Sequence, residues 1–177
     1  MMKLLAALLC CIALNTNAQP VPVPAGATYE AGFSPGRGSL PIVLKAIESA
    51  QQQIFVAAYG FTSKPIAKAL VDAHRRGVKV FVVADQKDNS KGYTAVTFLA
   101  NEGVSVRLNG RYAILHSKFM VIDNMHLQLG SFNYTAAAVD RNEENVLLLR
   151  NVATLAQQYV VEWKRLWEEG SDLPRAY

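Results

Sequence analysis

The stretch from His116 to Asn133 contains the side chains best suited to chemistry on an anionic group. An imidazole (His116) and a primary amine (Lys118) stand two residues apart, and a hydroxyl (Ser131) and a carboxamide (Asn133) follow with the same spacing. Imidazole attacks an electrophile or transfers a proton, whereas the other three groups stabilise negative charge that develops in a transition state. Taken together, the four residues favour catalysis over the alternative of a hydrogen-bonded core histidine.

A β-hairpin is expected to position these four side chains. The segment 117–122 is rich in β-branched and aromatic residues and ends in Asp123-Asn124, a turn sequence, so it reads as the first strand. The second strand is expected at 126–132. Side chains alternate between faces along a strand. If the connecting loop has an even number of residues, this alternation places the serine and asparagine beside the histidine and lysine.

Two sequence patterns in this hairpin resemble a known family signature. Residues 116–123 read H-x-K-x-x-x-x-D, and residues 130–133 read G-S-x-N. Together they resemble the signature of the phospholipase D superfamily, in particular its small secreted bacterial EDTA-resistant endonucleases, and the resemblance extends from about Thr28 onward. It implies a phosphodiesterase in which one histidine attacks phosphorus to form a phosphohistidine, a second histidine protonates the leaving oxygen, and water hydrolyses the intermediate.

Two carboxylates near the hairpin are expected to support this site. Asp123 has the opposite strand parity from His116, and both this parity and the family pattern give it a structural role in the turn. Two glutamates, ending at Glu144, precede a strand expected at 145–150. A carboxylate there is able to orient the histidine through its second nitrogen, with a solvated charge pair as the alternative. The family pattern Asn-x-Glu matches residues 142–144 and implies the orienting role for Glu144.

The implied mechanism requires two histidines, but the chain has one H-x-K motif. Neither His74 nor His126 is followed by lysine two residues later. A symmetric homodimer in which His116 of each subunit faces the twofold axis supplies the missing group. The active site is therefore expected at the dimer interface, with Glu144 behind each histidine.

DNA or RNA, cleaved without sequence preference, is the expected substrate. The formal net charge of +4 at pH 7 is compatible with a polyanionic partner. Loop residues near strand ends are candidates for contacts with the nucleic-acid backbone, with ordinary solvated charge as the alternative for each: Lys87, Lys91, Arg107, Arg111 and Tyr112. Two other functions are open, a phospholipase D-type lipid phosphodiesterase and a protein that binds nucleic acid without cleaving it.

Neither a cofactor nor a metal is expected. The sequence contains no H-E-x-x-H, no G-x-x-x-x-G-K-[ST] and no G-x-G-x-x-G pattern. Both cysteines, Cys10 and Cys11, lie in a segment expected to be removed, so no disulfide is expected in the mature chain. The chemistry is therefore assigned to side chains alone.

The chain is expected to consist of a removable leader and one domain. Residues 1–18 combine one lysine, an apolar run too short to span a bilayer and a small-residue exit, which is typical of a secretory signal peptide. Residues 19–27 alternate proline and valine and read as an extended Pro-rich leader. Residues 28–177 are then a single phospholipase D-like nuclease domain. The mature protein is expected in the periplasm or outside the cell, without stable membrane insertion.

Alternating strand and helix patterns predict the fold class. The apolar runs 54–61 and 78–84 are typical of strands buried on both faces, and the segments 39–52 and 63–77 have helical apolar spacing. This order predicts parallel strands with right-handed crossovers. Other elements are expected at 28–33, 92–101, 104–108, 134–140, 145–150 and 152–169, the last with Trp163 and Trp167 in packing roles. The fold class is α/β, with a mixed, largely parallel sheet flanked by helices on both faces.

Overall fold

A computed structural model describes residues 20–90, 92 and 94–176 of the chain. Its strands are β1 (Thr28–Ser34), β2 (Gln53–Ala58), β3 (Lys79–Asp85), β4 (Ser105–Asn109), β5 (Phe119–Ile122), β6 (His126–Gly130), β7 (Glu144–Arg150) and β8 (Ser171–Asp172). Its helices are α1 (Ser39–Glu48), α2 (Lys64–Arg75), α3 (Gln86–Asn89), α4 (Ala95–Asn101), α5 (Ala136–Asp140) and α6 (Ala153–Glu168).

The start of the chain is only partly described. The expected signal peptide, residues 1–18, lies outside the described residues, as does residue 19 of the expected leader. Residues 20–24 are exposed and belong to no helix or strand. In the described ranges, no helix is both long enough and apolar enough to cross a membrane.

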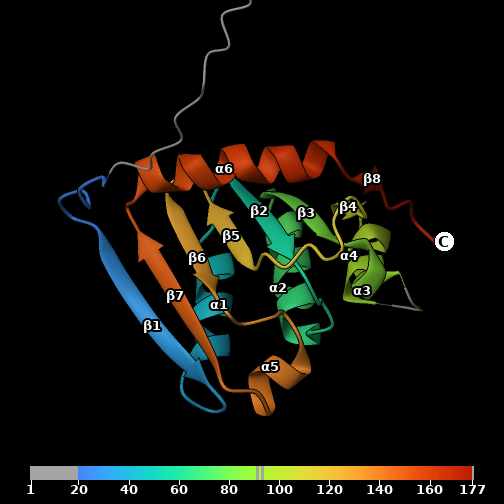
Figure 1. Ribbon diagram of the computed structural model, residues 1–177, viewed down its shortest axis with the longest axis horizontal. Coiled ribbons are helices and arrows are strands. Elements are labelled where there is room, and N and C mark those ends of the chain that lie inside the picture. The colour runs from blue at the N-terminus through green and yellow to red at the C-terminus, as the bar shows by residue number, and fades with distance from the viewer. Residues whose placement is uncertain (1–19, 91, 93, 177) are drawn as a thin grey trace, which may run out of the picture.

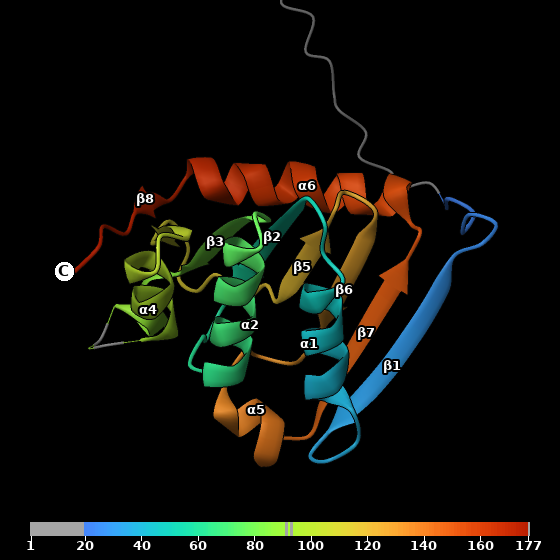
Figure 2. The same cartoon turned by 180° about the vertical axis from the view of Figure 1, so that it is seen from behind.

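The eight strands form one mixed sheet in the order β1-β7-β6-β5-β2-β3-β4-β8. Helices cover both faces of this sheet (Figures 1 and 2), which confirms the predicted α/β class. Fewer pairs of neighbouring strands are parallel than predicted. In the described chain, β3 pairs in parallel with β2 and β4, whereas the other neighbouring strands are antiparallel. The helical crossovers α2 and α4 produce the parallel pairs, whereas the hairpin and direct returns produce antiparallel ones.

The hydrophobic core lies in two layers, one on each face of the sheet. Ile54 and Val56 of β2 belong to the layer beneath α1, α2 and α4, whereas Phe55 belongs to the layer beneath α6. This double burial explains why β2 reads as a continuous apolar run. Trp163 of α6 is buried, donates its indole N–H to the carbonyl of Val56 at 2.8 Å and stacks on Trp167, with 5.0 Å between ring centroids. The predicted packing role of both tryptophans is confirmed.

The first helix is shorter than the predicted segment 39–52. It begins at Ser39, and Gly38 is the N-cap residue with a φ of 95°, a left-handed conformation that favours glycine. The helix ends at Glu48, four residues before its predicted end at Gln52. Ser63, the first residue of the predicted segment 63–77, is the N-cap residue of α2. The short elements α3 and β8 were not predicted.

Asp123 ties the hairpin of β5 and β6 to the start of β2. Its φ is 54°, and its carboxylate accepts the backbone N–H groups of Gln51, Gln52 and Gln53 at 2.8 to 2.9 Å. A carboxylate that accepts several backbone N–H groups holds a turn more firmly than a neutral acceptor. This geometry agrees with the structural role predicted for Asp123.

We expect Asp123→Ala to lower the free energy of unfolding by about 1 to 3 kcal/mol, because three N–H groups lose a charged acceptor. Urea denaturation followed by circular dichroism measures this loss. Asp140→Ala, at an exposed position of α5, is the control and is expected to change stability by less than about 0.5 kcal/mol. Equal losses in the two variants would contradict the role of Asp123.

Candidate active site

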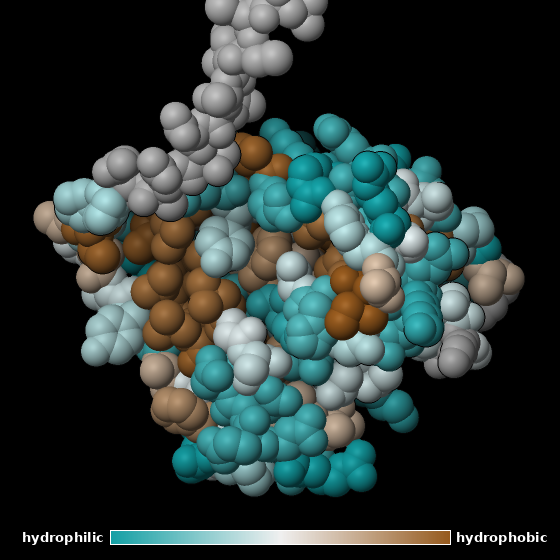
Figure 3. All heavy atoms as spheres, viewed as in Figure 1, coloured by the Kyte–Doolittle hydropathy of each residue, from teal (hydrophilic) through white to brown (hydrophobic). Residues whose placement is uncertain are grey.

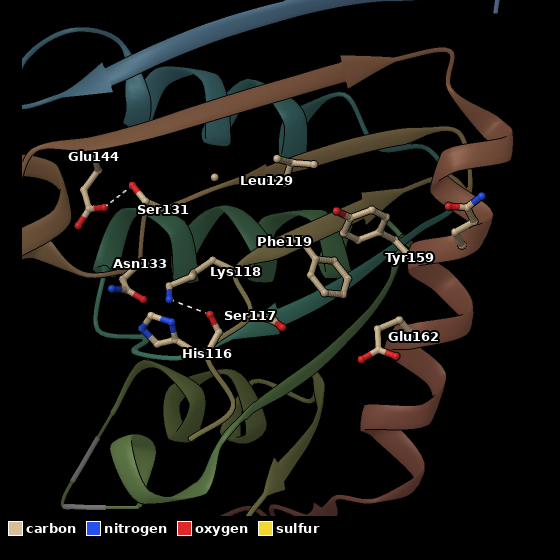
Figure 4. A pocket seen from close by; sticks show the side chains of 12 residues that line it. His116, Ser117, Lys118, Phe119, Leu129, Ser131, Asn133, Glu144, Tyr159 and Glu162 are labelled. Carbon is tan, nitrogen blue, oxygen red and sulfur yellow. Dashed lines mark hydrogen bonds between the residues drawn. The ribbon is translucent and has the colours of Figure 1, made fainter. Parts of the chain in front are cut away.

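The five side chains predicted to be catalytic lie together at one end of the sheet (Figure 4). They line a single pocket of about 920 Å³: His116, Lys118, Ser131, Asn133 and Glu144. At this end, β2, β3 and β6 finish, and β5 and β7 begin. Phe119 and the α6 side chain of Tyr159 form part of the opposite wall. The predicted cluster therefore exists in the folded chain.

The hairpin brings these residues together by a different route from the predicted one. Ile122 pairs with His126, so the loop between β5 and β6 has three residues, not an even number. With this register, even-numbered positions pair with even-numbered ones. The predicted loop of even length is therefore wrong. In addition, β5 begins only at Phe119, so His116 and Lys118 precede the strand and do not follow its alternation.

Gly130 ends β6 and sends the following residues into the pocket. Its φ is 148°, and a Cβ atom at this position would lie 2.2 Å from the carbonyl oxygen of Asn145 on β7. Only glycine permits this close approach of the two backbones. After this break, Phe132 and Tyr134 are fully buried, which leaves Asn133 between them at the pocket.

Lys118 is the buried cation of the site. The residue is only 9 % exposed, and its Nζ atom donates to the carbonyl of His116 at 2.7 Å. The same Nζ atom lies 5.5 Å from the ring centroid of Tyr59. Burial lowers the pKa of the Lys118 amine below its ordinary value, and the nearby Glu144 carboxylate partly opposes this effect. A buried amine of this kind is poised to gain an anionic partner.

His116 is exposed at the pocket and packs against an aromatic ring that the sequence analysis did not identify. The centroids of the His116 and Tyr59 rings are 5.0 Å apart, with an angle of 59° between the ring planes. Tyr59 directly follows β2 and is half-buried. A tyrosine at the end of an otherwise apolar strand was the available signal, because strand ends in α/β folds commonly line binding sites.

Glu144 contacts the hydroxyl of the site within one chain. Ser131 donates its Oγ–H to the carboxylate of Glu144 at 2.6 Å, and Asn142 donates its side-chain amide to the same carboxylate at 3.1 Å. Ser131 in turn accepts the backbone N–H of Asn145 at 3.1 Å. Between the described residues of a single chain, no hydrogen bond joins Glu144 to His116. The predicted contact between these two residues is therefore absent within one chain.

Asn133 presents an amide to the pocket. Its Oδ1 atom is buried without a hydrogen-bond partner among the described residues. The neighbouring Tyr134 anchors the segment because its hydroxyl donates to the buried Gln128 at 2.8 Å. Within residues 20–90, 92 and 94–176, no three His, Cys, Asp or Glu side chains lie close enough together to hold a metal ion.

The four residues predicted to contact nucleic acid that the structure describes do not line this pocket. Arg107 is engaged within the fold, since its guanidinium pairs with Asp172 at 2.7 Å and lies over the ring of Trp167. Arg111 is exposed but has an ionic contact with Glu169 at 3.5 Å, and Tyr112 donates its hydroxyl to the same carboxylate at 2.7 Å. 

The two remaining candidates are lysines around α3. Lys87 is exposed on α3 and lines a smaller cavity of about 320 Å³, together with Tyr112. Lys91 lies outside the described residues. Of the five candidates, Lys87 is therefore the one that the structure describes without an ionic or hydrogen-bonded side-chain contact.

We expect Lys118→Met to raise the free energy of unfolding by about 1 kcal/mol at pH 7, because the variant no longer buries a charge. The pH dependence of the free energy of unfolding is a second test of the buried charge. Between the lowered pKa of Lys118 and 10.5, the unfolded chain binds more protons than the folded chain, so wild-type stability rises with pH. This rise is expected to be smaller in the variant. Urea denaturation at several pH values measures both effects, and a less stable variant would contradict this view of Lys118.

The strand-end pocket combines an exposed imidazole with a buried amine, two groups suited to chemistry on an anionic group. The family model described as "Cardiolipin synthase, PLD-like domain" matches residues 43–167. The chain therefore belongs to the phospholipase D superfamily.

Three relatives illustrate the match. The solved structure of Nuc, a phospholipase D family member from Salmonella typhimurium, is 37% identical with a TM-score of 0.80, and the alignment covers 84% of this chain and 99% of that one. Phospholipase D of Rickettsia typhi is 33% identical over 74% of this chain and 64% of its own length. Mitochondrial cardiolipin hydrolase of Canis lupus familiaris is 30% identical over 76% of this chain and 52% of its own. The chain thus spans between half and two thirds of these curated relatives.

Proposed function

We propose that this protein is a phosphodiesterase, a metal-independent endonuclease that cleaves DNA or RNA through a phosphohistidine intermediate. The observation that carries this proposal is a pocket lined by the exposed His116 and by the buried Lys118, whose amine donates to the backbone carbonyl of His116. A ring nitrogen of His116 forms a bond to phosphorus, and the bond from phosphorus to the leaving oxygen breaks. A second histidine protonates that oxygen. Water then cleaves the bond between nitrogen and phosphorus, which regenerates the imidazole.

Lys118 and Asn133 are proposed to bind the phosphate oxygens, whereas Ser131, which donates its one O–H group to Glu144, is proposed to hold that carboxylate in place. The ammonium of Lys118 has three donors and uses one on the carbonyl of His116, so two remain for substrate. Asn133 supplies amide donors from its position at the pocket. Donors that are fixed before the reaction stabilise the charge that develops on phosphorus oxygens without reorganisation.

A second copy of the chain is proposed to complete the site. His116 is the one histidine that lines the pocket in the described part of the chain, whereas the mechanism requires two. A twofold axis beside the pocket supplies His116 of the other subunit. Both His116 and Glu144 line the pocket, yet no hydrogen bond joins them between the described residues of one chain, so we assign the orientation of each histidine to Glu144 of the other subunit.

An apolar surface next to the pocket supports this arrangement. On the face that carries α6, the sheet is open over β1 and β7, and Figure 3 shows hydrophobic atoms gathered there. Tyr29 is 73% exposed and Phe33 is 45% exposed on β1. Leu147 of β7 pairs with Ala31, which lies between them, Leu129 of β6 pairs with Leu147, and both leucines are half-buried. Leu129 also lines the pocket, so this surface is continuous with the site. Contiguous apolar surface of this kind is typical of a protein interface.

Three observations favour nucleic acid as the substrate. The hairpin patterns resemble those of small bacterial endonucleases, the chain covers 99% of Nuc, and the formal net charge is +4. A phospholipid is the second candidate, because curated relatives are named phospholipase D and cardiolipin hydrolase and the pocket has an apolar wall that includes Phe119 and Tyr159.

We further propose that residues 1–18 direct secretion and that residues 28–177 act as one domain in the periplasm or outside the cell.

The deciding experiment compares two substrates for the purified protein in excess EDTA. Supercoiled plasmid is expected to be nicked, whereas vesicles of phosphatidylcholine and cardiolipin are expected to release neither headgroup nor phosphatidic acid. Hydrolysis of the lipids without nicking would assign the lipid activity instead. Loss of plasmid cleavage in EDTA would contradict the metal-independent mechanism. Plasmid binding without cleavage would favour the non-catalytic binding protein.

A further inference from the structure

A buried carboxylate holds the segment that carries His116. Asp85 is the last residue of β3 and is 2% exposed. One of its carboxylate oxygens accepts the backbone N–H of Asp88 at 2.8 Å, and the other accepts the backbone N–H of Leu115 at 2.7 Å. Leu115 is itself buried and directly precedes His116. The carboxylate therefore fixes the backbone next to the histidine to the end of β3.

A buried amide fixes the end of β2 to the same point. Asn89 is 2% exposed, and its Nδ2 atom donates to the carbonyls of Tyr59 at 2.6 Å and Asp85 at 2.8 Å. Its Oδ1 atom accepts the backbone N–H of Phe61 at 3.2 Å. The single side chain thus holds the backbone on both sides of Gly60.

The two side chains act on the two segments whose aromatic rings meet in the pocket. Asp85 holds the His116 segment, Asn89 holds the Tyr59 segment, and the two ring centroids are 5.0 Å apart. We propose that Asp85 and Asn89 are positioning residues of this phosphodiesterase, an inference that rests on the proposed role of His116. They set the histidine against Tyr59 and thereby set the attack angle of the imidazole.

The cost of burying Asp85 argues for a role beyond packing. A buried carboxylate is expensive unless it is both paired and hydrogen-bonded, and Asp85 has two backbone N–H donors but no ionic partner in the described part of the chain. Its contact with Asp88 caps only the four-residue α3. The larger consequence is the link to Leu115, 30 positions along the chain. Displacement of a catalytic group by about 1 Å is able to slow a reaction by roughly 100-fold, so such a link has a kinetic effect.

The first test is Asp85→Asn in the full chain. The carboxamide retains one acceptor oxygen, but its NH₂ group faces a backbone N–H, so one of the two links is lost. With bis(p-nitrophenyl) phosphate as substrate, kcat is expected to fall by roughly 100-fold while KM changes by less than about threefold. Asn89→Asp is the second variant, because its carboxylate faces two carbonyl oxygens that it is unable to bond. In this variant too, kcat is expected to fall by roughly 100-fold while KM changes by less than about threefold.

Asp123→Asn is the matched control. It makes the same chemical change in a carboxylate that also accepts backbone N–H groups, but at the opposite end of β5 from His116. It is expected to lose stability and to retain kcat within about twofold. If both Asp85→Asn and Asn89→Asp fold and keep wild-type kcat, or lose kcat only as much as Asp123→Asn at equal stability, the positioning role is wrong.

Wild-type hydrolysis of the small phosphodiester distinguishes failure of the proposed function from failure of the positioning role. The wild-type chain must first hydrolyse the small phosphodiester in EDTA, and that hydrolysis must require His116. Failure of wild-type hydrolysis overturns the proposed function. Full wild-type activity with unaffected Asp85 and Asn89 variants overturns only the positioning role. If Asp85→Asn does not fold, Asn89→Asp alone decides, by the same kcat criterion.

Discussion

Replacement of His116 by alanine is expected to reduce phosphodiester cleavage by roughly 10⁴-fold or more, because the variant lacks the group that attacks phosphorus. The residue is exposed, so the fold does not depend on its side chain. Initial rates on plasmid and on bis(p-nitrophenyl) phosphate measure this loss. A chain quenched during turnover of a labelled phosphodiester is expected to carry acid-labile label in the wild type and none in the variant.

His126→Ala is the control for this experiment. His126 lies at the far end of β6, is half-buried and accepts the backbone N–H of Asn151 at 3.1 Å. Burial lowers the pKa of its imidazole, and the nearby Arg150 lowers it further. Cleavage by this variant is expected to stay within about twofold of the wild type. If His116→Ala kept more than about a tenth of wild-type activity, the nucleophile would lie elsewhere.

Leu147→Glu is expected to convert the proposed dimer to a monomer and to abolish cleavage. Leu147 is a half-buried residue of β7 on the open apolar face, opposite Ala31 of β1 and Leu129 of β6. A carboxylate forced into an apolar interface loses its hydration without gaining a partner, which costs several kcal/mol. Sedimentation equilibrium measures the association, and plasmid nicking measures the activity.

Val161→Glu is the matched control, since Val161 is 61% exposed on α6 and the change in charge is the same. This variant is expected to remain an active dimer. Mixed dimers supply a second readout. When wild-type and His116→Ala chains are exchanged at equal concentrations, a shared site predicts about a quarter of full activity, whereas independent sites predict about half. A fully active Leu147→Glu monomer would rule out the shared site.

The hairpin shows both the reach and the limit of inference from sequence. The types and spacing of His116, Lys118, Ser131 and Asn133 were sufficient to predict one cluster, and the chain does form it. The predicted register was wrong, because a loop length is not visible in strand periodicity. Gly130 compensates by ending β6 where its backbone meets Asn145. A glycine in the sequence does not reveal which backbone segment lies against it or in which direction the chain continues, because both depend on the neighbouring strand.

The residues that were missed act through contacts distant in sequence. Asp85 bonds to Leu115 and Asn89 bonds to Tyr59, each about 30 positions away. From the sequence alone, an aspartate after a buried strand reads as a loop residue. Contacts of Arg107 were likewise not predicted: its guanidinium pairs with Asp172 and lies over the ring of Trp167. Side-chain pairing of this kind depends on the tertiary fold, which local patterns do not encode.

The tryptophan pair gives the molecule an internal optical reporter with a defined location. Trp163 and Trp167 are the only tryptophans of the chain, and both belong to the layer between the sheet and α6. Tryptophan fluorescence therefore follows that layer alone, whereas far-ultraviolet circular dichroism also follows α1, α2 and α4 on the other face of the sheet. Coincident melting curves from the two signals would show that both layers unfold in one cooperative step. An earlier fluorescence transition would show that α6 detaches first and exposes the sheet face beside the catalytic pocket.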